Sequence, residues 1–223
     1  MKDVVAIDGP SASGKSTTAR MVARELGYLH LDTGAMYRAV TVACLRQNLP
    51  PQPSPQLDLL LDELDIQFDR EGSGDQRVLL AGEDVSGQIR SPEVNAVVSS
   101  YSALPQVRKR LVKLQQQAAE GNNVVCEGRD IGTRVFPDAR HKFFIVADLK
   151  VRAERRRDEL EAAGTAADLE ELMAELARRD KADTIREHSP LVKAEDAIEL
   201  DTSNLTIEMQ VERVIAHVKG RSA

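Results

Sequence analysis

The 223-residue chain contains no tryptophan, only 3 % aromatic residues and two cysteines, Cys44 and Cys126. Few aromatic residues and a net charge of −6 argue against a surface that binds nucleic acid by a basic stripe and base stacking. The two cysteines lie far apart and outside any His or Cys cluster, so neither a disulfide framework nor a zinc site is indicated. No run approaches the ~20 apolar residues of a membrane-spanning helix. We therefore expect neither a nucleic-acid partner nor a membrane partner.

The length and the start of the chain set the next expectations. One domain with insertions, covering residues 1–223, fits this length. A strand is expected almost immediately after Met1, which leaves no room for a secretory signal peptide. We expect a cytoplasmic protein, and a monomer because no sequence feature demands more.

The clearest motif is G-x-x-x-x-G-K-S, from Gly9 to Ser16, which follows a short apolar run and precedes a helical segment. Strand, glycine-rich loop and helix are the order of a phosphate-binding P-loop, whose backbone N–H groups converge on an anion at the helix N-terminus. Lys15 is placed to reach the β- and γ-phosphates of ATP, and Ser16 to ligate Mg²⁺. We expect Lys15 to lie on an exposed loop. The predicted ATP-binding residues are Gly9, Pro10, Ser11, Ala12, Ser13, Gly14, Lys15, Ser16 and Thr17.

Apolar runs alternate with helical segments along the chain, which predicts a parallel α/β sheet. Further strands are expected at residues 28–32, 124–127, 143–147 and 197–200, and a closing amphipathic helix begins near Ile207. The proline-rich residues 50–55 are expected to form neither helix nor central strand. After them we expect a short helix at 57–64 and a small antiparallel β insert, with a turn at 71–75, that closes near Gly87. Helices are predicted at 92–103 and 105–120.

Residues 150–188 are dense in charge. Because Arg155 and Glu159, and Arg157 and Glu161, stand at i,i+4 spacing, composition alone favours a solvated helical hairpin. No N-K-x-D motif for guanine is present, and the D-x-x-G that begins at Asp84 lies in the β insert, which argues against a GTPase switch. A P-loop accompanied by many arginines suits phosphoryl transfer, which needs positioning and charge neutralisation more than covalent chemistry.

Several runs resemble the bacterial cytidylate kinase family in the same order and at the same spacing: IDGPSASGKS at 7–16, LDTGAMYR at 31–38, GEDVSGQIR at 82–90, GRDIGT at 128–133 and RDKADTIR at 179–186. The resemblance covers nearly the whole chain. It implies a five-stranded parallel sheet flanked by helices, with core residues 1–56, 121–149 and 189–223. It also implies a nucleoside-monophosphate-binding region at 57–120, which contains the small antiparallel sheet, and a mobile Arg-rich lid at 150–188.

The same resemblance implies transfer of the γ-phosphoryl group from ATP to CMP or dCMP, with Mg²⁺ bridging the donor phosphates. It reverses the solvated interpretation of the lid, since at least one arginine of 152–157 would then close on the transferred group. The implied catalytic residues are Lys15, Arg129, Arg152 and Arg156. The implied acceptor-binding residues are Thr33, Ser99, Arg108 and Asp130 at the pyrimidine with Tyr37 nearby, Arg179 and Asp183 at the ribose, and Arg38, Arg129 and Arg186 at the phosphate.

Two positions depart from the family pattern. Glu127 stands where the family often has Asp before Gly-Arg-Asp, and it could orient Arg129 or reach toward Mg²⁺. Thr33 stands where some members have Ser, which keeps the hydroxyl. Two other functions stay open: another small-molecule kinase of this fold, such as an adenylate or shikimate kinase, and a regulator that senses ATP without turning it over.

Overall fold

The computed structural model describes residues 2–69, 77–162 and 164–220. The chain divides into two compact units. We call Met1–Asp32 with Gln116–Ala223 the sheet unit, and Thr33–Gln115 the inserted unit. In the described part of the chain, no helix is both long and apolar enough to cross a membrane.

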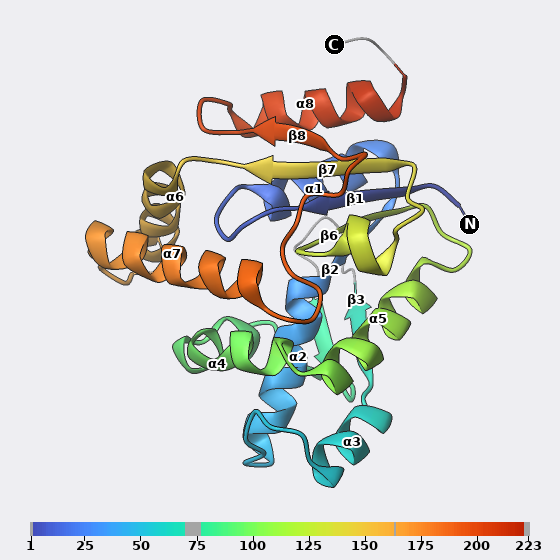
Figure 1. Cartoon of the computed structure of the whole chain (residues 1–223), viewed down its shortest axis with the longest axis vertical. Coiled ribbons are helices and arrows are strands. Elements are labelled where there is room, and N and C mark those ends of the chain that lie inside the picture. The colour runs from blue at the N-terminus through green and yellow to red at the C-terminus, as the bar shows by residue number, and fades with distance from the viewer. Residues whose placement is uncertain (1, 70–76, 163, 221–223) are drawn as a thin grey trace. The chain divides into compact units, whose positions relative to one another are not determined.

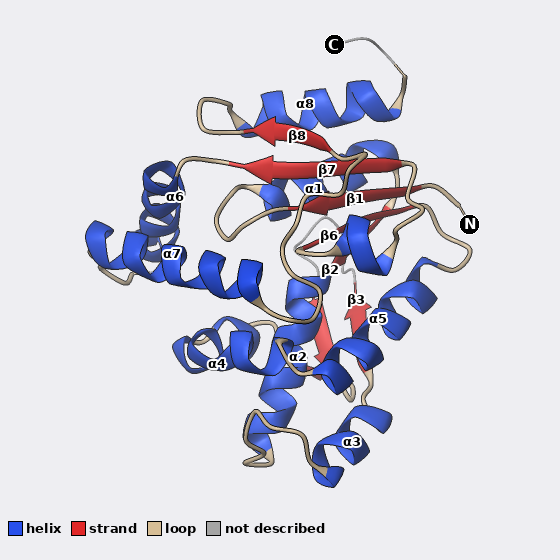
Figure 2. Cartoon of the chain, viewed as in Figure 1, coloured by secondary structure: helices blue, strands red, loops and turns tan. Residues whose placement is uncertain are grey.

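The sheet unit is built on parallel strands in the order β2-β6-β1-β7-β8, five among the described residues (Figure 2). They are β1 (Val4–Asp8), β2 (Leu29–Asp32), β6 (Val124–Gly128), β7 (His141–Val146) and β8 (Ile198–Asp201). All residues of β1 and β6 are buried, as expected for apolar runs in the middle of a parallel sheet. The predicted five-stranded parallel sheet flanked by helices is confirmed.

Helices α1 (Lys15–Leu26) and α8 (Ile207–Val218) pack on this sheet, with α8 lying along β8 (Figure 1). Their apolar faces, which include Val22 and Val214, join Ile7 and Ile145 of the sheet in one core cluster. Full burial of a side chain of this kind contributes about 1.5–3 kcal/mol. Helix α1 ends at Gly27, whose φ of 68° is the left-handed conformation that glycine adopts readily.

Strands β6 and β7 of the sheet unit are each followed by a segment rich in charged residues. Strand β6 leads directly into a π-helical turn, η2 (Ile131–Val135), after Asp130. Strand β7 leads into the helix pair α6 (Leu149–Ala162) and α7 (Leu169–Ile185), which packs through Ala153, Leu172 and Leu176. The predicted i,i+4 pair of Arg157 and Glu161 is present at 3.7 Å.

The inserted unit contains α2 (Thr33–Arg46), α3 (Pro55–Asp62), η1 (Gln88–Arg90), α4 (Pro92–Ser102) and most of α5 (Pro105–Ala119). It also contains the antiparallel strands β3 (Ile66–Asp69), β4 (Arg77–Leu80) and β5 (Glu83–Asp84), as predicted for the β insert. The expected turn at 71–75 lies outside the described residues. The expectation that residues 50–55 hold no helix was wrong at Pro55, which begins α3 because Ser54 caps it by accepting from Leu57 N–H.

Candidate active site

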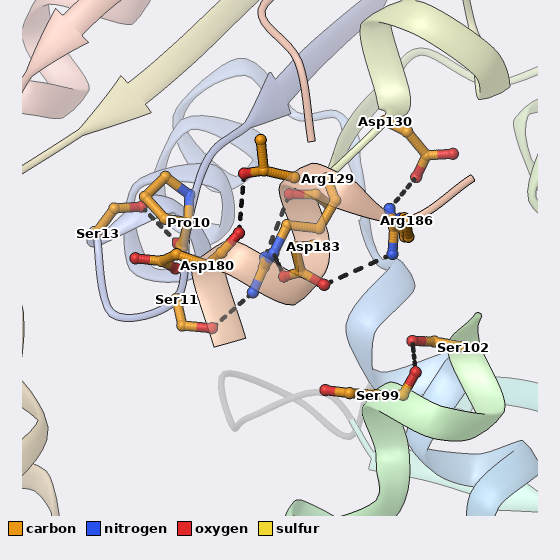
Figure 3. Close-up of polar contacts among 12 residues, drawn as sticks. Pro10, Ser11, Ser13, Ser99, Ser102, Arg129, Asp130, Asp180, Asp183 and Arg186 are labelled. Atoms are coloured by element: carbon orange, nitrogen blue, oxygen red, sulfur yellow. Dashed lines mark hydrogen bonds and ion pairs between the residues drawn. The ribbon is translucent and has the colours of Figure 1, made fainter. Parts of the chain in front are cut away.

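The glycine-rich loop joins the end of β1 to the start of α1. Gly9 has φ 156°, and a Cβ there would lie 2.2 Å from the Ile145 carbonyl oxygen, so only glycine fits. Gly14, at φ 89°, is the N-cap of α1 and directs the helix N-terminus toward the loop. The Ser13 hydroxyl donates to the Pro10 carbonyl at 3.0 Å (Figure 3). The loop thus has the backbone form that suits a phosphate group.

Lys15 is the first residue of α1 and is only 8 % exposed, so the expectation of an exposed loop position was wrong. Its Nζ turns back and donates to the Pro10 carbonyl oxygen at 3.0 Å, which brings the side chain against the loop. Burial lowers the pKa of Lys15 to about 7; the charge of Arg129 adds to this, while Glu127 and Asp32 oppose it. An incoming phosphate would favour the charged ammonium form.

Glu127, at the end of β6, lies beside Ser16: the Ser16 hydroxyl donates to Glu127 Oε2 at 2.6 Å. On its other side, His30 Nε2 lies 3.3 Å from Glu127 Oε1. Burial raises the pKa of Glu127, but the hydrogen bond from His30, the charge of Lys15 and the Ser16 hydroxyl outweigh it, and the pKa lies below its ordinary value. Of the two roles left open for Glu127, its position beside Ser16 favours the one directed to the metal.

These oxygen atoms fit a Mg²⁺ site of the kind in which nucleotide phosphates supply most ligands. Mg²⁺ takes oxygen ligands and is commonly held by one or two protein groups together with phosphates and water. The Ser16 hydroxyl and the Glu127 carboxylate are such groups. Among the described residues no cluster of three or more His, Cys, Asp or Glu side chains forms an all-protein metal site.

An alternating chain of charged residues runs from the loop to the end of β6 (Figure 3). Arg129 donates from Nη2 to the Ser11 hydroxyl at 2.7 Å and from Nε to Asp183 Oδ2 at 2.8 Å. Arg186 in turn lies 3.6 Å from Asp183 and 3.9 Å from Asp130. Burial raises the pKa of Asp183, but Arg129 and Arg186 outweigh it and hold the pKa below its ordinary value. The structure therefore brings four predicted acceptor residues together in one network.

The arginines of α6 divide into different environments. Arg152 is buried; its Nη1 donates to the Ser11 carbonyl oxygen at 3.2 Å and to Asp180 Oδ2 at 2.7 Å. The solvated interpretation was therefore wrong for Arg152, because α6 packs this side chain against the loop. Arg156 instead forms an i,i+3 ion pair with Glu159 of its own helix at 2.9 Å.

Arg179 of α7 lies in the same charged region, and burial lowers its pKa, with the charge of Arg129 adding to the effect. Its Nη1 lies 3.9 Å from Glu175. Asp183 and Glu175 oppose this lowering, and an incoming anionic group would stabilise the charged guanidinium further.

Arg155 and Thr202 support the loop, a role that the sequence did not predict for either. Arg155, expected to face Glu159, donates instead to the Ser13 carbonyl at 3.3 Å and to the Thr202 carbonyl at 2.6 Å. The Thr202 hydroxyl also donates to the Ser13 carbonyl, at 3.0 Å. Such contacts join residues far apart in the chain, so no local sequence pattern predicts them.

Asp8 also supports the loop, and the sequence did not mark it. Its two carboxylate oxygens accept from Ile131 N–H and Gly132 N–H, each at 2.8 Å, which ties the start of the loop to the turn after β6. Burial raises the pKa of Asp8 to about 6, even though the two backbone hydrogen bonds lower it. The available signal was an aspartate directly before Gly9, at the end of a wholly apolar strand.

The other predicted acceptor residues belong to the inserted unit. Tyr37 and Arg108 are both buried, and the Arg108 guanidinium lies 5.3 Å from the centre of the Tyr37 ring. Arg38 donates to Asn95 Oδ1 at 2.6 Å and to the Ile89 carbonyl at 3.1 Å. Thr33 is buried at the start of α2.

Ser99 is partly exposed on α4, where its carbonyl accepts from the Ser102 hydroxyl at 3.0 Å (Figure 3). Arg108 donates to the neighbouring Ser102 carbonyl at 3.1 Å. Ser99 and Arg108 are therefore linked through the last turn of α4.

Comparison with known proteins places this geometry in a family. The family model for cytidylate kinase matches residues 5–220. A cytidylate kinase of Streptococcus pneumoniae (strain 70585) is 48 % identical over 217 residues, 97 % of each chain. One from Symbiobacterium thermophilum is 45 % identical over 216 residues, 97 % of this chain and 96 % of that one.

A solved structure of an uncharacterized protein from Eubacterium ventriosum ATCC 27560 shares the fold, with a TM-score of 0.52 at 14 % identity over 99 % of this chain and all of that one. The fold alone is common to proteins of different activities. The family model and the sequence relatives extend over nearly the whole chain, and on that basis the chain belongs to the cytidylate kinase family.

Proposed function

We propose that this protein is an ATP-dependent kinase of CMP or dCMP, giving CDP or dCDP and ADP. The observation that carries the proposal is the meeting of a P-loop with the arginine–carboxylate network on Ser11, in a chain 48 % identical to a cytidylate kinase. Phosphoryl transfer requires positioned cations around the transferred group more than it requires a nucleophilic side chain. Transfer is therefore direct and in line, with no covalent enzyme intermediate.

The donor site consists of residues 9–17. Backbone N–H groups of the loop bind the β- and γ-phosphates, and Lys15 supplies a cation once phosphate raises its pKa. Ser16, oriented by Glu127, offers an oxygen ligand to Mg²⁺. When bound, Mg²⁺ would neutralise the charge of the donor phosphates. Arg152 and Arg156 are the proposed contacts of the lid with the transferred group.

The proposed acceptor residues follow from the motif positions shared with the cytidylate kinase family. Arg38, Arg129 and Arg186 would bind the acceptor phosphate, and Arg179 with Asp183 the ribose. Thr33, Ser99, Arg108 and Asp130 would contact the pyrimidine, next to Tyr37. Residues 57–120 are then the acceptor-binding region and 150–188 the lid. We propose a monomer in the cytoplasm that binds no nucleic acid.

Asp130 and Arg108 supply the proposed choice of base. Cytosine presents an amino donor at N4 and an acceptor at N3, which a carboxylate and a guanidinium satisfy. Uracil presents an acceptor at O4 and a donor at N3, so each contact becomes a mispair. An unsatisfied buried polar group costs about 1–3 kcal/mol, and sites built on hydrogen bonds discriminate by as much as ~10⁴.

Coupled ADP release across CMP, dCMP, UMP, AMP and shikimate tests the proposal, with ATP and Mg²⁺ saturating. We expect turnover with CMP and dCMP far above the other acceptors. Highest turnover with AMP or shikimate would indicate another small-molecule kinase of this fold. Binding of ATP without turnover of any acceptor would indicate a regulator. The Lys15→Ala variant, measured in parallel, controls for contaminating kinases.

A further inference from the structure

Asp180 of α7 is a mostly buried carboxylate that the proposed donor and acceptor contacts do not use. Its Oδ2 accepts from Arg152 Nη1 at 2.7 Å. Its Oδ1 is buried and has no hydrogen-bond partner among the described residues. The ion pair with Arg152 is thus the side-chain interaction that holds Asp180 in this position.

Arg152 has a fixed orientation. Its side chain is 8 % exposed, Nε donates to the Ala147 carbonyl at 3.0 Å and Nη1 to the Ser11 carbonyl at 3.2 Å. Carbonyl oxygens accept hydrogen bonds but do not neutralise a buried guanidinium. Asp180 supplies the opposing charge, and charge-assisted hydrogen bonds are roughly twice as strong as neutral ones. Without Asp180, Arg152 would be a buried charge with no opposing charge, which favours its movement away from the loop into solvent.

The arrangement repeats three residues further along α7. Asp183 holds Arg129, and Arg129 donates to the Ser11 hydroxyl. Residues at i and i+3 share one helix face, so α7 presents both carboxylates toward the loop (Figure 3). Ser11 therefore receives one arginine on its carbonyl oxygen and one on its hydroxyl, each fixed by a carboxylate of the same helix.

We infer that Asp180 is a positioning residue for phosphoryl transfer: it holds the guanidinium of Arg152 against the Ser11 carbonyl of the P-loop, ready to meet the transferred phosphoryl group. The inference rests on the proposed kinase function. Asp180 acts through Arg152 and does not itself contact substrate. A misplacement of about 1 Å in such a group costs as much as about 100-fold in rate.

The test is a double-mutant cycle with Asp180→Asn and Arg152→Ala, measured by coupled ADP release with CMP. Asp158→Asn is the matched control, because it is the same substitution at an exposed carboxylate of α6, 71 % exposed and 3.7 Å from Arg157. We expect Asp180→Asn to lower kcat about 10- to 100-fold with the KM for CMP changed less than about threefold. The double variant Asp180→Asn/Arg152→Ala should have the same kcat as Arg152→Ala alone. Asp158→Asn should have the kcat of wild type.

Other outcomes overturn the inference. A lower melting temperature of Asp180→Asn with wild-type kcat would make Asp180 a stabilising residue only. An equal loss of kcat with or without Arg152 would mean that Asp180 acts on the substrate or metal directly. If Asp180→Asn does not fold, Asp180→Ser, which also removes the charge, replaces it in the cycle, and there wild-type kcat would refute the inference. Absence of CMP turnover in the wild type would instead refute the proposed function.

Discussion

Glu127→Gln should impair turnover because it removes a buried charge from beside Ser16 and Lys15. The carboxylate accepts from the Ser16 hydroxyl at 2.6 Å and lies 3.3 Å from His30. Hydrogen bonds to charged groups contribute about 1.5–3 kcal/mol and neutral ones about 0.5–1.5 kcal/mol, so each contact loses about 1 kcal/mol. With 1.4 kcal/mol per tenfold, the loss in kcat/KM for ATP should be about 10- to 100-fold.

A second effect of the same substitution gives an independent measurement. Glu127 opposes the lowering of the Lys15 pKa, so its neutralisation should move that pKa further below about 7. If protonated Lys15 is required, the fall of kcat/KM at alkaline pH should begin at a lower pH in Glu127→Gln. A pH series of coupled ADP release measures this shift.

Glu127→Asp is the informative comparison, because the charge persists and only its reach shortens by one methylene. We expect it to stay within about tenfold of wild type, without the pH shift. Glu25→Gln, at an exposed position of α1, is the control for loss of an acidic side chain. Equal and small effects of Glu127→Gln and Glu127→Asp would refute the reasoning and leave Glu127 as the end of a strand.

Three further substitutions test other parts of the site. Lys15→Ala should abolish transfer, and near-normal kcat with CMP would contradict the assignment. Wild type should take up protons when it binds ATP near pH 7, and Lys15→Ala should not. Calorimetry in two buffers measures this uptake. Lys15 binds its proton less tightly in the folded protein than in the unfolded chain, so the free energy of unfolding of wild type should rise between about pH 7 and pH 10.5. Melting experiments across this pH range should show a smaller rise for Lys15→Ala. Asp130→Ala should reduce kcat/KM for CMP more than for UMP, so that the CMP-to-UMP ratio of kcat/KM falls at least about tenfold while ATP affinity changes little. If kcat/KM fell by the same factor for CMP and UMP, Asp130 would be a structural or metal-linked carboxylate. Gly9→Ala should lower both the melting temperature and ATP affinity, since its Cβ would collide with the Ile145 carbonyl. Gly87→Ala is the control, because Gly87 has open space around it, and it should change neither quantity. Equal changes in the two variants would contradict the steric argument.

The features that the sequence predicted correctly are those with local causes. The P-loop is a contiguous motif, and β1 and β6 begin with continuous apolar runs whose burial follows from composition. The family resemblance, now confirmed, added the expectation that the parallel sheet has five strands. The assignment of individual acceptor residues stays a prediction.

The errors concern side chains whose environment is set by distant parts of the chain. Lys15 was expected to lie on an exposed loop, yet it is buried against Pro10. Arg155 stands at i,i+4 from Glu159, but its guanidinium meets Thr202, 47 residues later. The pairing of Arg152 with Asp180 likewise depends on how α6 packs on α7. Helical spacing cannot distinguish a solvated arginine from one that turns toward another element.

The long-range support of the phosphate loop has a consequence for how the protein forms during synthesis. The loop is made first, but Arg152, Thr202 and Gln210, which hold Ser11, Ser13 and Thr18, follow 141, 189 and 192 residues later. Contacts so distant in sequence form late, because a long stretch of chain must close before they contribute. We therefore expect a nascent chain to acquire ATP affinity only when nearly all of it has been translated, and a chain that stops before Thr202 to bind ATP poorly.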